Sequence, residues 1–273
     1  MGKVKDIVRL DKYLADMGVG TRSEVKNLIR KGRVCVGQEI VKKPEMKVDL
    51  GEDIVTVDGN PISYVNYEYY MLNKPAGVIS ASTDPKAETV IDLLFEAVRK
   101  DLFPVGRLDK DTEGLLLITN DGDLAHKLLS PKKHVDKVYF ARILGIVTNE
   151  DVELFANGLV VDEELTAMPA KLIIKGTKKI NVASIAQQIE SEEEYLKTKG
   201  LLNIDCNNEV VVTEIELTIR EGKFHQVKRM FEAVGKKVVY LKRLSMGSLH
   251  LDETLELGGY RPLTETELEE LRK

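Results

Sequence analysis

An acidic turn between two apolar segments is the feature of this sequence that most restricts its fold. Residues 106–114 read Gly-Arg-Leu-Asp-Lys-Asp-Thr-Glu-Gly, and they lie between the apolar segments 103–105 and 115–119. Short apolar runs bounded by glycine and acidic residues are typical of buried strands joined by a loop. The sequence therefore predicts a sheet that presents several carboxylates from one loop, a place where proteins commonly carry out chemistry.

The composition is that of an ordinary soluble protein with one large domain, or a large domain and a small module. The chain has 273 residues, of which 43% are hydrophobic. No apolar run approaches the roughly 18 residues that a membrane span needs, and the amino end has no signal-peptide core. Cys35 and Cys206 show no disulfide or metal-site spacing, so we expect a reduced, cytoplasmic setting.

The formal net charge of −5 is distributed unevenly. Residues 1–44 carry eleven Lys or Arg and five Asp or Glu, a balance of +6, and residues 220–243 carry eight and two, again +6. Two basic regions on an acidic background are compatible with a bound polyanion, and they are equally compatible with solvated helix faces. Charge alone does not decide between the two.

Residues 1–60 form a separate module in this interpretation. Apolar residues recur at helical spacing from Ile7 to Met17, and Thr21 with Glu24 offers a capping box for a second helix. Short strands are expected at residues 34–36 and 54–57. This order would place six basic residues near one surface: Arg9, Arg22, Lys26, Arg30, Lys31 and Arg33.

The same module resembles the S4 RNA-binding domain over residues 8–14, 21–24 and 29–36. The resemblance implies that its basic residues contact phosphates, which gives affinity without sequence choice. A small helical domain with an exposed basic face is the alternative.

A linker at residues 61–67 leads to a larger domain at residues 68–273, where strand and helix patterns occur in mixed order. We expect an α+β fold with a large mixed or antiparallel sheet. Strands are expected at residues 67–72, 103–108, 115–119, 137–145, 170–174, 210–220 and 237–243. Helices are expected at residues 89–98, 122–129, 149–155 and 225–234, and the polar, acid-rich residues 184–208 are expected to be an excursion between strands.

Asp109 is the carboxylate of the acidic turn that we single out. Taken alone, an Asp beside Asp111 and Thr112 is equally typical of a turn residue. Residues 106–117 as a whole, however, resemble the catalytic motif of the RsuA/RluB/RluE/RluF group of rRNA pseudouridine synthases. The resemblance implies that Asp109 is the essential carboxylate and that Arg107 lies at the active site and assists RNA binding.

Two further motifs resemble the same family. The motif Lys137-Val138-Tyr139 implies a Tyr that packs against the target base, where stacking is worth about 1–3 kcal/mol. Taken alone, a Tyr in an apolar strand is typical of a core residue. Residues 221–231 imply a helix start whose cation, here Lys228, keeps the catalytic carboxylate ionised. Many relatives have Arg there, and Lys is a point charge, so the geometry of the pair stays open. Arg229 beside it is expected to bind RNA.

The resemblance runs from residue 7 to about residue 271, apart from residues 184–208. It implies that a monomer isomerises one uridine of ribosomal RNA to pseudouridine, without metal or redox cofactor. Residues 225–231 and 259–264 resemble the branch that acts on 16S rRNA. A 23S rRNA synthase and a non-catalytic rRNA-binding assembly factor remain alternatives, as does a glycosidase with paired carboxylates. No Gly-x-Gly-x-x-Gly follows a strand and no His has metal-ligand spacing, which disfavours dinucleotide and metal enzymes.

Overall fold

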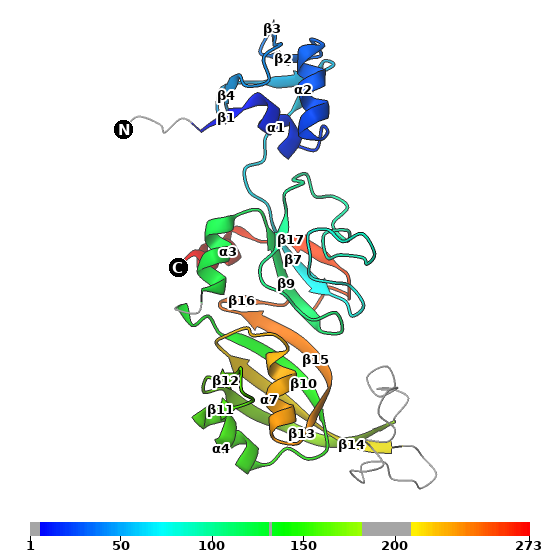
Figure 1. Ribbon diagram of the computed structural model, residues 1–273, viewed down its shortest axis with the longest axis vertical. Coiled ribbons are helices and arrows are strands. Elements are labelled where there is room, and N and C mark those ends of the chain that lie inside the picture. Colours follow the sequence, from blue (N-terminus) through cyan, green and yellow to red (C-terminus); the bar gives the residue numbers. More distant parts are fainter. Residues whose placement is uncertain (1–5, 131–132, 182–208) are drawn as a thin grey trace. The chain divides into compact units, whose positions relative to one another are not determined.

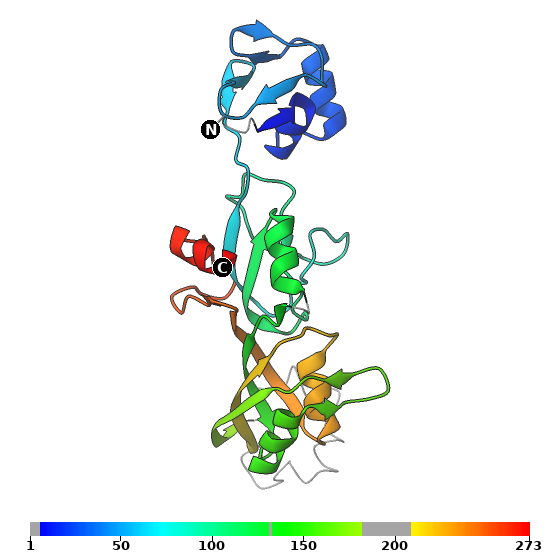
Figure 2. The same cartoon turned by 90° about the vertical axis from the view of Figure 1, so that its left-hand side faces the viewer.

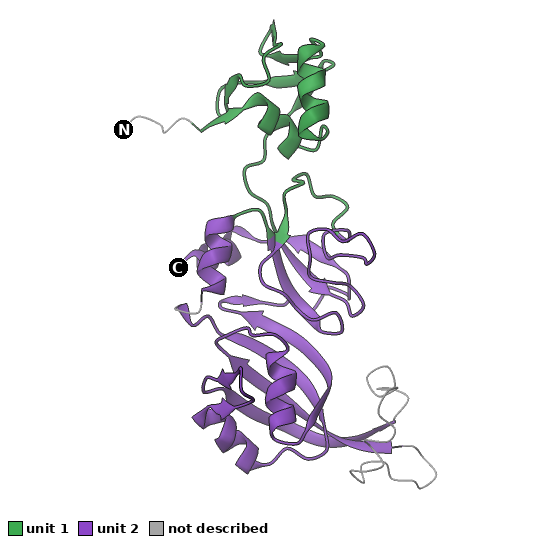
Figure 3. Cartoon of the chain, viewed as in Figure 1, with its two compact units in different colours: residues 1–69, 94–103, 119–121 green, residues 70–93, 104–118, 122–273 purple. Residues whose placement is uncertain are grey.

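The computed structural model, seen from two sides in Figure 1 and Figure 2, describes residues 6–130, 133–181 and 209–273. The excursion predicted for residues 184–208 lies outside the described residues. The chain divides into two compact units (Figure 3). Unit 1 contains residues 1–69, 94–103 and 119–121, and unit 2 contains residues 70–93, 104–118 and 122–273. None of the helices in the described ranges is long and apolar enough to span a bilayer.

The first part of unit 1 is a small module of helices and short strands. Its helices are α1 (Leu10–Asp16) and α2 (Arg22–Arg30). A two-stranded sheet consists of β1 (Ile7–Arg9) and β4 (Lys47–Asp49). A four-stranded sheet has the order β3 (Glu39–Ile40), β2 (Val34–Val36), β5 (Val55–Val57) and β6 (Asn60–Ile62). Buried Leu, Ile and Val side chains from the helices and strands form one core.

Both predicted helices of this module are present, although the first begins later than its apolar spacing indicates. Ile7 pairs with Asp49 in the β1–β4 ladder, so the chain is strand before it becomes helix at Leu10. The predicted capping box is confirmed at the start of α2. The Thr21 hydroxyl accepts the Glu24 amide at 3.3 Å, and the Glu24 carboxylate accepts the Thr21 amide at 2.7 Å.

The segment after β5 continues to pack on the module. The Tyr13 hydroxyl donates to the Ile62 carbonyl at 2.5 Å, and the Tyr13 and Tyr64 ring centroids lie 4.8 Å apart. Val65 also contacts the core of the module. Ordered packing therefore extends into the residues that follow position 60.

A buried ionic cluster around Arg99 holds residues 94–103 within unit 1. The Arg99 side chain is 3% exposed, and its Nη2 lies 2.5 Å from Asp101 and 3.4 Å from Asp16 of α1. The Tyr64 hydroxyl donates to Asp16 at 2.9 Å, and the Arg99 guanidinium lies 5.3 Å from the centre of the Tyr64 ring. Two carboxylates thus compensate one guanidinium, as a buried charge requires.

The helix predicted over residues 89–98 is wrong, because this segment consists of turns. Thr89 and Asp92 form one capped turn, in which the Asp92 carboxylate accepts the Thr89 amide at 2.8 Å. Further along, the Glu68 carboxylate accepts the Arg99 amide at 2.8 Å and the preceding amide at 3.3 Å. These contacts satisfy amides that a helix would have used, so apolar spacing alone misassigns the segment.

Unit 2 is built on a nine-stranded sheet of the described residues. The strand order is β13-β14-β10-β15-β9-β7-β17, with β16 beside β15 and β8 beside β9. The strands are β7 (Tyr69–Lys74), β8 (Phe103–Pro104), β9 (Glu113–Thr119), β10 (Lys137–Leu144), β13 (Lys171–Asn181), β14 (Glu209–Ile219), β15 (Lys237–Met246), β16 (Leu249–His250) and β17 (Tyr260–Pro262). Strands β13, β14, β10 and β15 pair antiparallel, whereas β9 pairs with β15 in parallel. The mixed α+β architecture is as predicted.

Two helices cover one face of this sheet (Figure 2). Phe155 of α4 (Asn149–Asn157) and Phe231 of α7 (Gln226–Ala233) are fully buried, with ring centroids 4.9 Å apart. Helix α4 contacts β13, and α7 contacts β15. The remaining elements are helices α3 (Gly122–Leu129) and α8 (Glu265–Arg272) and the hairpin of β11 (Leu159–Val160) with β12 (Thr166–Ala167). Helix α8 was not predicted.

Candidate active site

The acidic turn predicted from the sequence is an irregular loop between β8 and β9. Regular strand structure ends at Pro104 and resumes at Glu113, so Arg107 and Asp109 are loop residues. The strand expected at residues 103–108 therefore ends earlier, at Pro104. The Asp109 carbonyl accepts the Thr112 amide at 3.1 Å, which closes a turn and directs the carboxylate outward.

A buried lysine holds the backbone of this loop through hydrogen bonds. Lys74, at the end of β7, is fully buried and donates to the carbonyls of Pro75 at 2.9 Å, Lys110 at 3.2 Å and Thr112 at 2.9 Å. Burial lowers the pKa of Lys74 to about 8, against the opposing influence of nearby carboxylates such as Asp111. Because Lys74 is fully buried, its role is to hold the loop in place.

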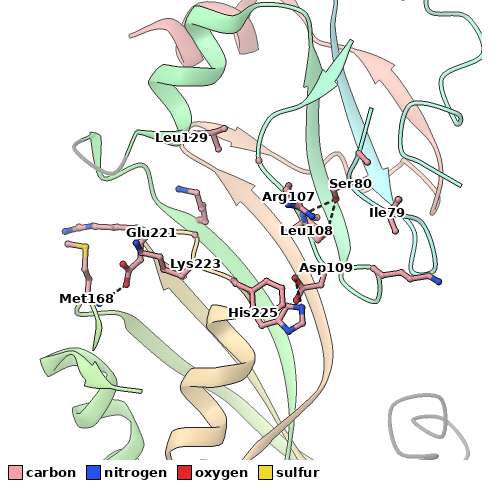
Figure 4. Close-up of a pocket in the computed structure, with 17 residues that line it drawn as sticks. Ile79, Ser80, Arg107, Leu108, Asp109, Leu129, Met168, Glu221, Lys223 and His225 are labelled. Atoms are coloured by element: carbon pink, nitrogen blue, oxygen red, sulfur yellow. Dashed lines mark hydrogen bonds and ion pairs between the residues drawn. The ribbon is translucent and has the colours of Figure 1, made fainter. Parts of the chain in front are cut away.

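Ser80 fixes the loop on the other side. Its hydroxyl donates to the Leu108 carbonyl at 2.8 Å and accepts the Leu108 amide at 3.0 Å (Figure 4). Both groups belong to the residue just before Asp109. Sequence reasoning missed Ser80, because nothing in its local sequence indicates a contact with a loop that lies further along the chain.

Two side chains from the start of α7 reach the Asp109 carboxylate. Lys228 Nζ lies 3.3 Å from Asp109 Oδ2, and His225 Nε2 lies 3.5 Å from Asp109 Oδ1. Figure 4 shows Asp109 and His225 facing each other. Lys228 also donates to both oxygens of Asp111, at 2.6 and 2.8 Å, so its shorter contacts are with Asp111. The cation expected beside Asp109 is present and is shared between two carboxylates.

The loop that precedes α7 is closed by Gln226. Its side chain accepts the Lys223 amide at 3.0 Å and donates to Glu221 at 2.7 Å. His225 adopts a left-handed conformation with φ of +49°, which is uncommon for a residue other than glycine and is typical of functional sites. The buried Gln226 therefore holds a strained turn beside Asp109.

Tyr139 and Arg107 lie near Asp109 in different surroundings. Tyr139, on β10, is 7% exposed, and with Asp109 it lines a small cavity of about 60 Å³. Arg107 is exposed and lines the same cavity. The structure thus brings Arg107, Tyr139 and Lys228 together around Asp109.

A larger cleft of about 750 Å³ opens beside this cavity. The residues that line it include Arg107, Asp109, Lys137, Lys223 and His225. Lys137 is buried and donates to the Val135 carbonyl at 2.8 Å, and burial together with nearby Arg243 lowers its pKa. The cleft is lined by two half-buried carboxylates, Asp109 and Glu221, and by several cations, and the excess of cations is suited to a polyanionic substrate.

The seven predicted RNA-binding residues divide into two groups. Three of them are held by carboxylates: Arg9 by Asp11 at 2.8 Å, Arg33 by Asp58 at 2.8 Å, and Arg229 by Asp162 at 2.5 Å. Within the described part of the chain, the other four have no ion pair: Arg22, Lys26, Arg30 and Lys31. All four lie on α2 or directly after it.

The chemistry that these residues can perform rests on the single carboxylate. Asp109 is 23% exposed, so its oxygens can reach a ligand in the cleft while Lys228 stabilises their charge. A carboxylate in this position can act as a nucleophile or as a base. In the parts of the chain that the structure describes, no three His, Cys, Asp or Glu side chains are grouped to hold a metal ion.

Known protein families, proteins and structures resemble this chain over most of its length. Residues 68–233 match the family model "RNA pseudouridylate synthase", and residues 8–54 match the S4 domain. An uncharacterised RNA pseudouridine synthase, YtzG, of Bacillus subtilis is 45% identical, with 96% of this chain and 97% of that protein covered. Ribosomal small subunit pseudouridine synthase A of Escherichia coli is 37% identical, with 96% and 98% covered.

Ribosomal large subunit pseudouridine synthase B of Bacillus subtilis is also 37% identical, with 97% of this chain and 95% of that protein covered. A crystal structure described as a pseudouridylate synthase has a TM-score of 0.59 and 33% identity, with 97% of this chain and 99% of that chain covered. The chain therefore belongs to the RNA pseudouridylate synthase family and carries an S4 domain.

Proposed function

We propose that this protein isomerises a uridine of ribosomal RNA to pseudouridine, with Asp109 as its catalytic carboxylate and no cofactor. The observation that carries the proposal is the position of Asp109, 3.3 Å from Lys228 Nζ and open to a cleft of about 750 Å³. Ribosomal RNA is the substrate named for two of its relatives, which supports the same substrate here.

The reaction breaks the bond between N1 of uracil and C1′ of ribose and forms a bond between C5 and C1′. N1 gains a proton and C5 loses one, so the product is an isomer and no redox partner is needed. Asp109 acts either by attack at the sugar or as a base on the ribose. The base must first leave its stack, and Tyr139, which lines the small cavity with Asp109, packs against it once it is extruded. Arg107 helps to hold that nucleotide, and Lys228 supplies a positive charge beside the Asp109 carboxylate.

The proposed roles of the domains follow the domain boundaries predicted from the sequence. Residues 1–60 bind RNA through the S4 domain, residues 61–67 connect, and residues 68–273 perform catalysis. Exposed cations on and after α2, among them Arg22 and Arg30, contact phosphates, and Arg229 does so beside the active site. We further propose that the protein works as a monomer in the cytoplasm.

The proposed target is one uridine of 16S rRNA. Residues 225–231, with the wording His-Gln-Val-Lys-Arg-Met-Phe, and residues 259–264 resemble the small-subunit branch of the family. Large- and small-subunit synthases are equally identical to this chain, at 37%. A direct comparison of 16S and 23S transcripts is therefore part of the test.

The test is tritium release from C5-labelled uridine in separate 16S and 23S rRNA transcripts. We expect wild-type protein to release tritium from 16S rRNA, and Asp109→Asn to release none. Asp111→Asn, two residues along the same loop, is the matched control and is expected to retain release. Release from 23S rRNA alone would reassign the target. Tight binding of both transcripts without release by wild type would favour the non-catalytic assembly factor.

A further inference from the structure

Phe224 is an exposed aromatic residue at the cleft that contains Asp109. Its side chain is 75% exposed, and it lines the cleft together with Lys223 and His225. Single exposed apolar residues are common on protein surfaces, so exposure by itself assigns no role. The surroundings of the ring are more informative.

The Phe224 ring is stacked on the imidazole of His225. The ring centroids lie 3.8 Å apart and the planes are inclined by 17°. His225 therefore covers one face of the phenyl ring, and the high exposure places the other face in solvent. Because His225 Nε2 also lies 3.5 Å from Asp109, the stack connects the catalytic carboxylate to an open aromatic face.

The loop holds this ring outward through contacts on both sides. The Phe224 carbonyl accepts a hydrogen bond from Arg229 at 3.3 Å, and the preceding Lys223 amide donates to Gln226 at 3.0 Å. His225, next in the chain, is fixed in the left-handed conformation. Strain of this kind persists where the surroundings enforce it, typically at ligand sites. The ring is thus presented by a braced turn.

The charges around the ring fit a nucleotide. Arg107 and Lys223 line the same cleft, and neither forms an ion pair with any other described residue. A flat apolar face flanked by available cations is the combination that binds single-stranded RNA, where bases stack on aromatic rings and cations meet phosphates.

We propose that the outer face of Phe224 is a stacking site for the base adjoining the isomerised uridine. Its ligand is an unpaired RNA base, held while its neighbour is extruded toward Asp109. The inference rests on the proposed function, since it places the uridine at Asp109. Phe224 is a positioning residue, which binds RNA and takes no part in bond changes.

The variants Phe224→Leu and Phe224→Tyr test the stacking site. Leu keeps an apolar side chain but has no flat face, whereas Tyr keeps the ring. In the tritium-release assay, we expect Phe224→Leu to raise KM on the order of tenfold, with kcat changed less than about twofold. Phe224→Tyr should match wild type. Phe95→Leu is the control, because Phe95 is 83% exposed and does not line the cleft.

An abasic scan of the transcript identifies the stacked nucleotide. Removing the base on either side of the target uridine in turn should raise the wild-type KM on the order of tenfold at one position. The same abasic transcript should cause no further loss with Phe224→Leu, because the two changes remove one contact. Additive losses at both positions would overturn the proposal.

The outcomes separate this inference from the proposed function. If wild type releases tritium but Phe224→Leu keeps its KM, the stacking site is wrong and the function stands. A loss in kcat alone with Phe224→Leu would assign the ring to support of His225, which also contradicts the proposal. If wild type releases no tritium from either transcript, the proposed function itself fails.

Discussion

Lys228 donates hydrogen bonds to Asp111 and forms an ion pair with Asp109, and this sharing decides how it acts on Asp109. Its contacts with Asp111 are 2.6 and 2.8 Å, whereas Asp109 lies 3.3 Å away. A lysine is a point charge with three donors, so it can serve both acids, where the planar fork of an arginine would favour one bidentate partner. The family resemblance implied a cation beside Asp109, and Lys228 lies there. That Lys228 also pairs with Asp111 could not be predicted from the sequence.

Replacing Lys228 should lower turnover more than RNA affinity. We expect Lys228→Gln to reduce kcat on the order of a hundredfold, because it removes the cation nearest to the reacting carboxylate. Lys228→Arg should recover most of this loss. Single-turnover tritium release at saturating rRNA measures the effect. If Asp111→Asn caused an equal loss, the role of Lys228 would be to hold Asp111 instead.

The pH dependence of stability should show the burial of Lys74. Its pKa is about 8 in the folded protein and near 10.5 when exposed, so the unfolded chain binds more protons between these values. Below pH 8 the buried charge of Lys74 lowers the free energy of unfolding by its full amount. This destabilisation is lost as the pH rises from 8 toward 10.5. The wild-type free energy of unfolding should therefore rise relative to Lys74→Met, by on the order of 3 kcal/mol over that window. Urea titrations across this range check the slope, and a difference independent of pH would contradict it.

At the scale of single residues, the sequence could predict the carboxylate and its companions but not the groups that brace them. Asp109 and Tyr139 lie in sequence motifs that are specific to one family. Ser80 and Gln226 act through hydrogen bonds to other loops, and such contacts follow from tertiary packing. Burial of Lys137 likewise depends on strand neighbours that no local pattern indicates.

Among the elements, the parallel pairing of β9 with β15 depends on one glycine next to the loop that contains Asp109. Gly114 pairs with Arg243 in the parallel ladder and has φ of +100°. A Cβ there would lie 2.3 Å from the Arg243 carbonyl oxygen, closer than backbone atoms can approach. Arg243 in turn donates to the Leu115 carbonyl at 2.8 Å. The motif glycine is therefore explained by a close backbone approach.

Gly114→Ala should both destabilise the protein and displace the loop that carries Asp109. We expect a loss of more than about 2 kcal/mol in the free energy of unfolding, from the steric conflict and the positive φ. Gly176→Ala is the matched control, because Gly176 lies in β13 with no atom within 4 Å of an added Cβ. Thermal unfolding of the two variants gives the comparison. Equal melting temperatures would show that the β9–β15 contact can relax.

Most elements could be predicted because their signals are local. The capping box of Thr21 and Glu24 and the alternating strands β10 and β14 depend on neighbouring residues. The predicted helix at residues 89–98 fails because Glu68 captures its last amides. Helix α8 was missed although Thr264 and Glu267 carry a capping box, because the apolar stripe that follows is weak and only Leu271 is buried.

The whole molecule has a net charge of −5, but the surface of α2 is locally basic. We expect Arg30→Ala to reduce the slope of log affinity for rRNA against log salt concentration by about 1, since one phosphate contact is lost. Arg33→Ala is the matched control and should reduce the slope less, because its guanidinium is already held by Asp58. Fluorescence anisotropy over a series of KCl concentrations gives both slopes. Equal reductions would mean that the Arg33–Asp58 pair opens on binding.

The ionic cluster of unit 1 also sets an order of events during synthesis. During synthesis Asp16 and Tyr64 are translated before Arg99, so these groups at first lack their cation. Residues 119–121 complete unit 1 later still, after residues 70–93 and 104–118 of unit 2 have been translated. Unit 1 thus begins with the first residues translated but is complete only after the ribosome has passed the codon for Asp109.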